Sequence, residues 1–196
     1  MGQAKSTDQK YTYQDYLHWP DEERWEIIAG AAYSMTPAPS VKHQVISRNI
    51  EVFLVNEIRT EKKECEVFDA PTDVVFDEYN VVQPDLFVVC DKAKITEENI
   101  KGSPDLIIEV TSPSTSLKDK REKKKLYERF GVKEYLIVYP DGELVERFLI
   151  EDEKYGAPEI FNWDETMRIE SLGLDMDLWE IFEKEREEKK EVPGQR

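Results

Sequence analysis

Continuous runs of apolar residues between turn residues predict the strands of a buried sheet. Residues 106–111 are almost wholly apolar, which is typical of a strand covered on both faces, and residues 81–89, which contain the apolar run LFVV, predict another strand. Residues 134–139 and 144–150 flank Pro-Asp-Gly and therefore predict a β-hairpin. Further strands are predicted over residues 24–28 and 32–35 as a second hairpin, over 66–76 with an interruption at Pro71, and over 160–161 and 167–169 as edge strands.

Helical spacing of apolar residues marks two long segments. Ser40 is a good N-cap for residues 41–58, whose apolar residues surround much of the helix and predict that it is largely buried. Residues 117–130 predict a helix that ends at Gly131. Two short helices are also predicted, one capped by Thr12 and one starting at Asp175 or Asp177. Together these elements predict an α/β (α+β) fold, with a mixed β-sheet core flanked by helices.

The length of 196 residues suits one domain. We predict a disordered tail over residues 1–10, a single domain over 11–182 and a charged helix end or tail over 183–196. No apolar run approaches a membrane span, and the N-terminus lacks the apolar core of a signal peptide, so the expected location is cytoplasmic with no membrane association. Cys65 and Cys90 fit no metal-ligand spacing and are too few for a disulfide framework, so both are predicted to be reduced.

The net charge of −16 restricts the class of partner. Nonspecific affinity for DNA comes mainly from Lys and Arg side chains that neutralise phosphates. The charge therefore argues against a broad basic surface for nucleic acid, although a local basic groove around a metal ion stays compatible with it.

Two of the predicted buried strands carry a carboxylate. Asp85 lies in the strand over 81–89, and Glu109 is the charge within the apolar run over 106–111. A bare charge inside a sheet costs several kcal/mol unless a partner neutralises it. A metal ion would neutralise Asp85 and Glu109 together, whereas a buried Lys or Arg would serve Glu109 alone; the strand pattern leaves both interpretations open. Asp105 lies on the same strand face as Glu109 but four residues earlier, and it reads as a strand-entry residue.

The helix over 117–130 supplies a candidate partner. At helical spacing Lys123, Leu126, Tyr127 and Phe130 share one face, so Lys123 lies centrally on the stripe that faces the core. A lysine in that position requires a carboxylate or phosphate partner, or else its charged end reaches out to solvent.

These motifs resemble a known family. The sequences QPD, PDLIIEVTSPST, D-x-x-x-K-x-x-x-Y and GVKEYLIVYPDG are similar to those of the PD-(D/E)XK nuclease superfamily, and more closely to its bacterial Uma-type, restriction-endonuclease-like family. WEIIAG and MTPAPSVKHQ resemble the N-terminal hairpin and helix of that family. The resemblance covers residues 11–182 and implies a restriction-endonuclease-like core.

The resemblance also implies roles for individual residues. Asp85 matches the Asp of the PD pair, and Glu109 matches the acidic residue of the (D/E)XK half. The usual lysine position of that half is Thr111 here, which departs from the pattern, and Lys123 resembles a lysine that has migrated to the helix. Glu26 matches an acidic residue on an early element. The family pattern also places His43, Gln44 and Tyr127 along the site.

The implied chemistry is hydrolysis of DNA phosphodiester bonds with Mg²⁺ or Mn²⁺. Asp85, Glu109 and the Val110 carbonyl would hold the ion, because hard divalent cations take oxygen ligands. The family also implies a homodimer. Two other functions stay open on the same fold: a binding or structural protein without catalysis, which the charge favours, and a hydrolase of another phosphate ester.

Overall fold

The chain folds around a mixed seven-stranded sheet in a computed structural model that describes residues 9–20, 23–35, 39–111 and 117–185, with residues 117–120 described by their backbone alone. Strand β8 lies inside this sheet, antiparallel to β6 and parallel to β9. The parallel step from β8 to β9 runs through helix α3, as such connections require. The strands are β3 (Glu66–Asp69), β6 (Leu86–Val89), β8 (Leu106–Val110), β9 (Glu134–Tyr139), β10 (Leu144–Glu151), β11 (Lys154–Tyr155) and β12 (Glu159–Asn162). The predicted central strand and the hairpin from β9 to β10 are confirmed.

Two smaller sheets complete the strands of the described residues. The five-stranded one has the order β2-β1-β5-β4-β7 and contains the predicted N-terminal hairpin. Its strands are β1 (Trp25–Ile28), β2 (Ala31–Ser34), β4 (Val74–Asp77), β5 (Asn80–Val82) and β7 (Ile100–Lys101). The third sheet is the hairpin of β13 (Thr166–Ile169) and β14 (Leu174–Asp177).

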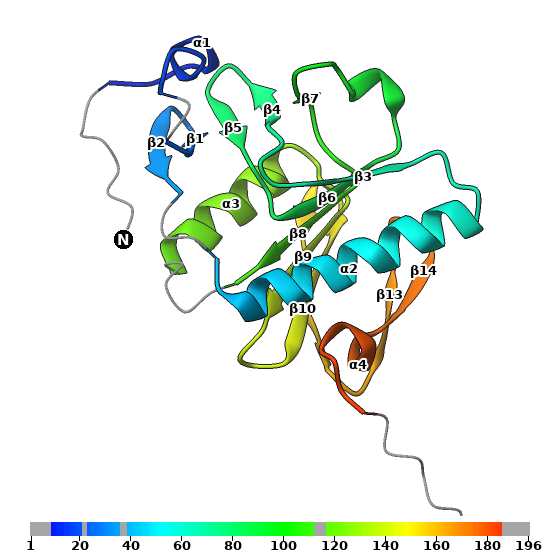
Figure 1. The fold of residues 1–196 in the computed structure, drawn as a ribbon. Coiled ribbons are helices and arrows are strands. Elements are labelled where there is room, and N and C mark those ends of the chain that lie inside the picture. The colour runs from blue at the N-terminus through cyan, green and yellow to red at the C-terminus, as the bar shows by residue number, and fades with distance from the viewer. Residues whose placement is uncertain (1–8, 21–22, 36–38, 112–116, 186–196) are drawn as a thin grey trace, which may run out of the picture.

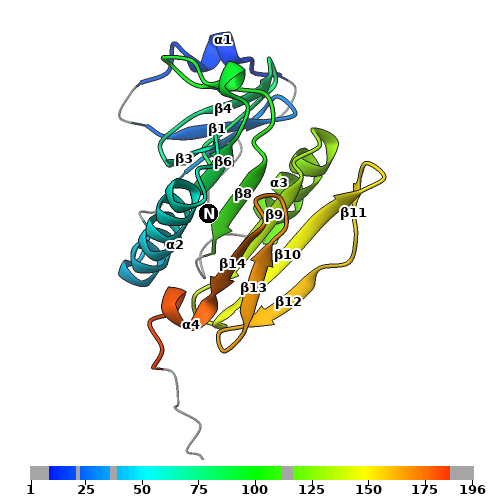
Figure 2. The ribbon, with the colours of Figure 1, turned by 90° about the vertical axis from the view of Figure 1, so that its right-hand side faces the viewer.

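Helices cover both faces of the central sheet (Figures 1 and 2). The helices are α1 (Tyr13–Tyr16), α2 (Val41–Thr60), the 3-10 turn η1 (Lys92–Lys94), α3 (Leu117–Arg129) and α4 (Leu178–Ile181). One apolar core joins α2, β13, β14 and α4 to one face, and the other joins α3 and the five-stranded sheet to the opposite face. These layers confirm the predicted α+β class. Thr12 and Ser40 cap α1 and α2 as expected.

The structure divides each of two predicted strands into two separate strands. Residues 66–76 form β3 and β4, and residues 81–89 form β5 and β6; in both cases the halves belong to different sheets. Pro71 and Pro84 lie at the breaks, because a proline has no N–H for the ladder and the chain must leave one sheet there. Asp85 therefore lies in the crossing between two sheets and not within a strand.

The prediction that α2 is buried on most sides is wrong. Its buried residues His43, Ile46, Ile50, Leu54 and Ile58 form one stripe, while Val41 and Val52 are 81% and 53% exposed. The helix is a surface helix with one core face. Of the two predicted starts of the last helix, Asp177 is confirmed as the N-cap of α4, whereas Asp175 is wrong because residues 174–177 form β14 against β13.

The prediction that Cys65 and Cys90 are reduced is also wrong, since the structure joins them in a disulfide. The antiparallel register of β3 and β6 pairs Glu66 with Val89. Cys65 precedes Glu66 and Cys90 follows Val89, so the two cysteines lie opposite each other at the end of the strand pair. That register depends on tertiary pairing and could not be read from the spacing of two cysteines.

Parts of the domain prediction lie outside the described residues, namely residues 1–8 and 186–196. Within the described part, α4 ends at Ile181, and none of the helices is long and apolar enough to span a membrane.

Candidate active site

A buried cluster of ion pairs joins strand β8 of the central sheet to strand β1 and helix α3. Lys123 of α3 places its Nζ 2.7 Å from Oε1 of Glu26 on β1 and 3.0 Å from Oε1 of Glu109 on β8. The Tyr127 hydroxyl, one helical turn after Lys123, donates to the same Glu109 oxygen at 2.7 Å. These side chains come together because strand alternation turns Glu109 towards α3, while the helical repeat turns Lys123 and Tyr127 towards the sheet.

Asp85 lies beside this cluster and is held by two donors. Its Oδ2 accepts the Val110 N–H at 2.8 Å and lies 3.2 Å from Nε2 of His43, at the start of α2. Asp85 is the most open of the acidic residues here, with 25% of its side chain exposed. The end of β8 and the starts of α2 and α3 meet at one side of the molecule, which is the left side of Figure 1.

Burial and like charges shape the pKa values of these groups. Burial raises the pKa of Glu109; the Lys123 charge opposes this, and the charges of Asp85 and Glu26 add to it. Burial lowers the pKa of Lys123, but the charges of Glu109 and Glu26 outweigh it and raise that pKa, so the ammonium stays charged. Burial lowers the pKa of His43 as well, and the hydrogen bond and charge of Asp85 reverse the shift to a raised pKa.

The two candidate ligand carboxylates each keep one oxygen for a further partner. Among the described residues, Lys123 and Tyr127 both contact Oε1 of Glu109, and Val110 and His43 both contact Oδ2 of Asp85. The second oxygens of these carboxylates, Oε2 of Glu109 and Oδ1 of Asp85, have no hydrogen-bond or ion-pair partner among the described residues.

This donor set fits a hard divalent cation. Glu26 and Glu109 share the Lys123 ammonium and Asp85 lies beside them, so negative charge remains to be neutralised in a poorly solvated place. No group of three or more His, Cys, Asp or Glu side chains that could hold a metal is found in the described ranges. Mg²⁺ does not require one, because it keeps several waters and is commonly bound through one or two carboxylates.

Other predicted residues lie at the margin of the cluster or away from it. Thr111 follows β8 and is half-buried, with its N–H bonded to the Val138 carbonyl at 2.8 Å. Gln44 is exposed on α2. Asp105 accepts from Lys133 at 2.6 Å and from the Cys90 N–H at 2.8 Å at the opposite end of β8 from Val110. The side chain of Asp119, which the D-x-x-x-K motif includes, lies outside the described residues.

Two neighbours of the cluster escaped the sequence analysis. The backbone N–H of Gln83 donates to Oε1 of Glu26 at 3.0 Å, and the side chain of Gln83 binds Arg24. The available signals were the place of Gln83 within QPD and the place of Arg24 two residues before Glu26.

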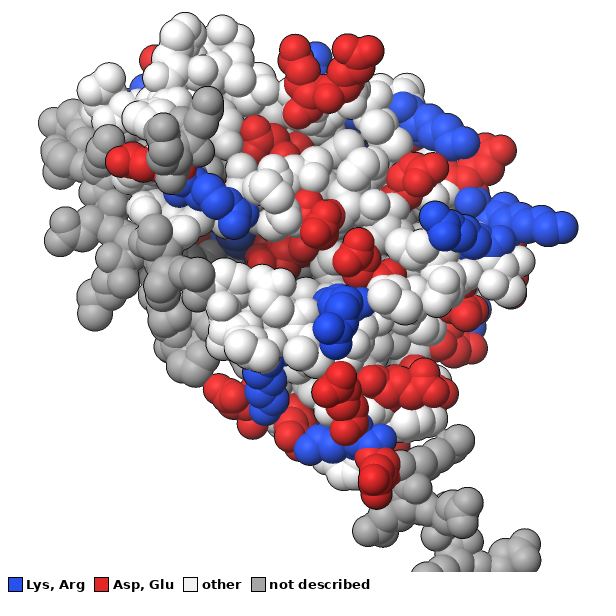
Figure 3. Space-filling view, in the orientation of Figure 1, with Lys and Arg blue, Asp and Glu red and all other residues white. Residues whose placement is uncertain are grey.

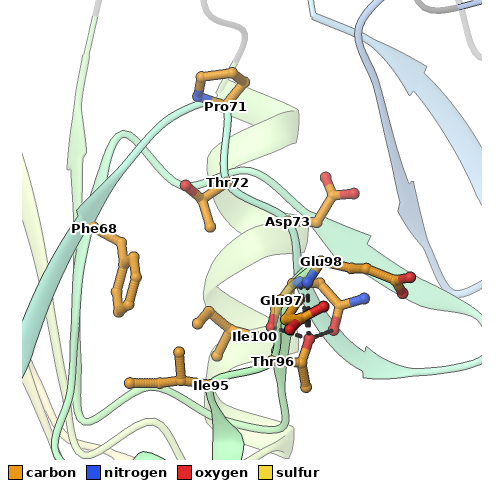
Figure 4. Close-up of a pocket in the computed structure, with 10 residues that line it drawn as sticks. Phe68, Pro71, Thr72, Asp73, Ile95, Thr96, Glu97, Glu98 and Ile100 are labelled. Atoms are coloured by element: carbon orange, nitrogen blue, oxygen red, sulfur yellow. Dashed lines mark hydrogen bonds between the residues drawn. The ribbon is translucent and has the colours of Figure 1, made fainter.

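A separate cavity of about 300 Å³ contains none of the clustered residues (Figure 4). It is lined by Phe68, Pro71, Thr72, Asp73, Ile95, Thr96, Glu97, Glu98, Asn99 and Ile100. The Thr96 hydroxyl is occupied by hydrogen bonds to Asn99, and the charged groups of the lining are all acidic. This cavity is therefore unsuited to phosphate.

Acidic and basic side chains are interspersed on the face drawn in Figure 3, and the described part of that face shows no broad basic patch. This face thus agrees with the expectation from the net charge. Contact with nucleic acid through this face has to rely on a few local cations.

Comparisons with known proteins point in one direction. The Uma2 family model, described as "Putative restriction endonuclease", matches residues 13–178. The uncharacterized protein slr1290 of Synechocystis sp. (strain ATCC 27184 / PCC 6803 / Kazusa) is 28% identical over 171 residues, which are 84% of this chain and 87% of that protein. The crystal structure of "a putative nuclease belonging to DUF820" from Anabaena variabilis ATCC 29413 matches with a TM-score of 0.73 at 20% identity, over 88% of this chain and 97% of that chain. At this identity the structural match shows the fold alone, and it confirms the restriction-endonuclease-like core expected from the sequence.

Proposed function

Because this chain belongs to the Uma2 family of restriction-endonuclease-like proteins, we propose that it is a metal-dependent endonuclease that hydrolyses phosphodiester bonds of DNA. The family description and the shared fold support a nuclease. The dependence on a metal, the choice of DNA and the catalytic roles below are our proposal.

One observation carries it: Lys123 lies on α3, and its Nζ reaches Glu109 at 3.0 Å. A lysine at the position of Thr111, directly after β8, would approach the same carboxylate from the strand side. The helix thus supplies, from a different position in the sequence, the cation that the sequence motif lacks. Ion pairs join Glu26, Glu109 and Lys123, and Asp85 lies beside them, which is the arrangement that the proposed chemistry needs.

The metal ligands would be Asp85 and Glu109, through the oxygens that the described residues leave open, together with the Val110 carbonyl. A bound Mg²⁺ or Mn²⁺ ion would supply Lewis-acid activation of a water and of the phosphodiester. His43 and the Val110 N–H fix the orientation of Asp85, and Tyr127 fixes that of Glu109.

Lys123 would act on the reacting atoms. Its ammonium would orient the attacking water or stabilise the negative charge that develops on the phosphoryl oxygens. Glu26 also holds that ammonium, at 2.7 Å, and the charges of Glu26 and Glu109 keep it charged. Glu26 and Tyr127 are thus positioning residues in this proposal.

The same ion pairs favour a second candidate, a nuclease-fold protein that binds or supports a partner without catalysis. In that case Lys123 serves only to neutralise Glu26 and Glu109. The net charge of −16 agrees with this candidate too. The two candidates differ in whether a divalent cation binds Asp85 and Glu109.

The decisive experiment is cleavage of supercoiled plasmid and of single-stranded DNA with Mg²⁺ or Mn²⁺, compared with EDTA. The variants are Lys123→Ala and Asp85→Asn, the second of which keeps an acceptor for the Val110 N–H. The matched control is Lys125→Ala on the same helix, whose side chain is 76% exposed. Circular dichroism establishes that each variant is folded, and calorimetric titration with Mn²⁺ measures metal binding separately from activity.

We expect metal-dependent cutting that falls by about 10²–10³-fold in Lys123→Ala and is unchanged in Lys125→Ala. Asp85→Asn should lose both cutting and Mn²⁺ binding. Folded wild-type protein that binds Mn²⁺ but cuts neither DNA would reject the proposed substrate. Folded protein that binds no divalent cation would support the non-catalytic candidate.

A further inference from the structure

A second hydrogen-bond network begins where the ion-pair cluster ends. Nε and Nη2 of Arg24 both donate to Oε1 of Gln83, at 3.0 and 2.8 Å. Nε2 of Gln83 donates in turn to the Tyr16 hydroxyl at 3.1 Å and to Oδ1 of Asp73 at 2.9 Å. The amide of Gln83 is thereby fixed on both of its ends, and it fixes the plane of the guanidinium.

The guanidinium of Arg24 is held by a neutral acceptor. Lys123, Lys133 and Arg147 each contact a carboxylate, whereas the ion pairs among the described residues do not include Arg24. An amide orients an arginine without neutralising it. A guanidinium has five N–H donors, so two bonds to Gln83 leave three for another partner. The residue is also exposed.

Direct contacts connect Arg24 to the candidate active site. The backbone N–H of Gln83 donates to Oε1 of Glu26 at 3.0 Å, and that oxygen is the one that Lys123 approaches at 2.7 Å. Arg24 also precedes Glu26 by two residues, so strand alternation directs both side chains to the same side of the β1 segment. Arg24 is exposed, and Gln83 joins its guanidinium to Glu26 of the ion-pair cluster.

We propose that Arg24, oriented by Gln83, binds a backbone phosphate of the nucleic acid next to the bond that is cleaved. This inference rests on the proposed nuclease function and adds a phosphate-binding position to it. Phosphate fits because a planar guanidinium makes paired, charge-assisted hydrogen bonds to phosphate oxygens. In a chain with a net charge of −16, a cation beside Glu26 that pairs with no carboxylate of the described residues has a large effect on where a polyanion can approach.

The competing explanation is structural: Arg24 would merely tie β1 to the crossing between β5 and β6. A hydrogen bond with that structural role contributes to stability but leaves the salt dependence of DNA binding unchanged. A phosphate contact changes that salt dependence, because each neutralised phosphate releases counterions and contributes about 0.9 to the slope of log affinity against log salt.

The test measures the affinity of the full chain for a short fluorescein-labelled DNA duplex by anisotropy, at several salt concentrations. Ca²⁺ is present as the divalent ion, and a gel verifies that the duplex stays intact. The variants are Arg24→Gln and Arg24→Lys, which retains the charge but lacks the fork. The matched control is Arg48→Gln, because Arg48 is an exposed arginine of α2 that pairs with Glu183 at 3.8 Å. Thermal unfolding and Mn²⁺ titration are recorded for every variant.

We expect Arg24→Gln to weaken binding about tenfold at low salt and to reduce the salt slope by about one, with unchanged Mn²⁺ affinity. Arg24→Lys should keep the slope and weaken binding less, and Arg48→Gln should match wild type. Wild type that binds and cuts DNA while Arg24→Gln matches it in affinity and slope would overturn the inference alone. Binding that depends on Arg24 without cutting would keep the phosphate site and reject the nuclease. Wild type that binds no DNA would reject both.

Discussion

Lys123 pairs with two buried carboxylates, and replacing it with methionine measures how far the fold depends on that charge. Its Nζ lies 2.7 Å from Glu26 and 3.0 Å from Glu109, and the three side chains are 12%, 7% and 14% exposed. Removing one partner of a buried ion pair costs about 3–5 kcal/mol, because a charge stays behind without solvent or partner. We expect Lys123→Met to lower the free energy of unfolding by about that amount at about pH 8.

The loss should shrink as the pH falls. Burial already raises the pKa of Glu109, and the charge of Lys123 opposes that shift, so removing the ammonium raises the pKa further. An acid with a higher pKa in the folded state binds more protons folded than unfolded in the interval between the two values. Within that interval the free energy of unfolding rises as the pH is lowered, and the variant should recover towards about pH 5.

Urea denaturation followed by tryptophan fluorescence measures both effects. The control is Lys125→Met on the same helix, whose Nζ is 3.9 Å from Glu122 and whose side chain is 76% exposed. Its unfolding free energy should stay within about 0.5 kcal/mol of wild type. This stabilising role of Lys123 is refuted if the unfolding free energy of Lys123→Met falls by less than about 1 kcal/mol at about pH 8. It is also refuted if that free energy depends on pH as it does in the control.

Three further predictions use the same denaturation assay. Tyr127→Phe removes the 2.7 Å bond to Glu109 and should cost about 1.5–3 kcal/mol, so an unchanged unfolding curve would contradict that bond. Burial raises the pKa of Asp105, but Lys133 and the Cys90 N–H outweigh it and lower the pKa. The stability from Asp105 is therefore present above its unfolded pKa and lost as the pH falls through the lower folded value. The unfolding free energy of wild type should exceed that of Asp105→Asn at neutral pH, and the difference should close as the pH falls through the folded pKa. Reduction of the Cys65–Cys90 disulfide, whose cysteines are 25 residues apart, should cost about 3–4 kcal/mol. A thiol assay of the unreduced, denatured protein that finds free thiols would refute that disulfide.

The elements that carry the chemistry could be predicted from the sequence. Periodicity placed Glu109 inside a buried strand, and it placed Lys123 and Tyr127 on the core-facing stripe of a helix, because apolar spacing reports directly which side of an element faces the core. Capping residues located the starts of α1 and α2, and the hairpin from β9 to β10 followed from Pro-Asp-Gly. The family motifs then indicated which of these residues belong to one site.

The sequence does not predict which elements pack together, and this became visible in the tertiary structure. It separated β3 from β4 and β5 from β6 into different sheets, and so placed Asp85 at a crossing where His43 and Val110 hold it. Neither the bond of Gln83 to Arg24 nor the disulfide of Cys65 with Cys90 has a local signal in the sequence, since each joins segments far apart in the chain. Local patterns follow from backbone geometry within a few residues, whereas these pairings follow from how two apolar cores close on a shared sheet.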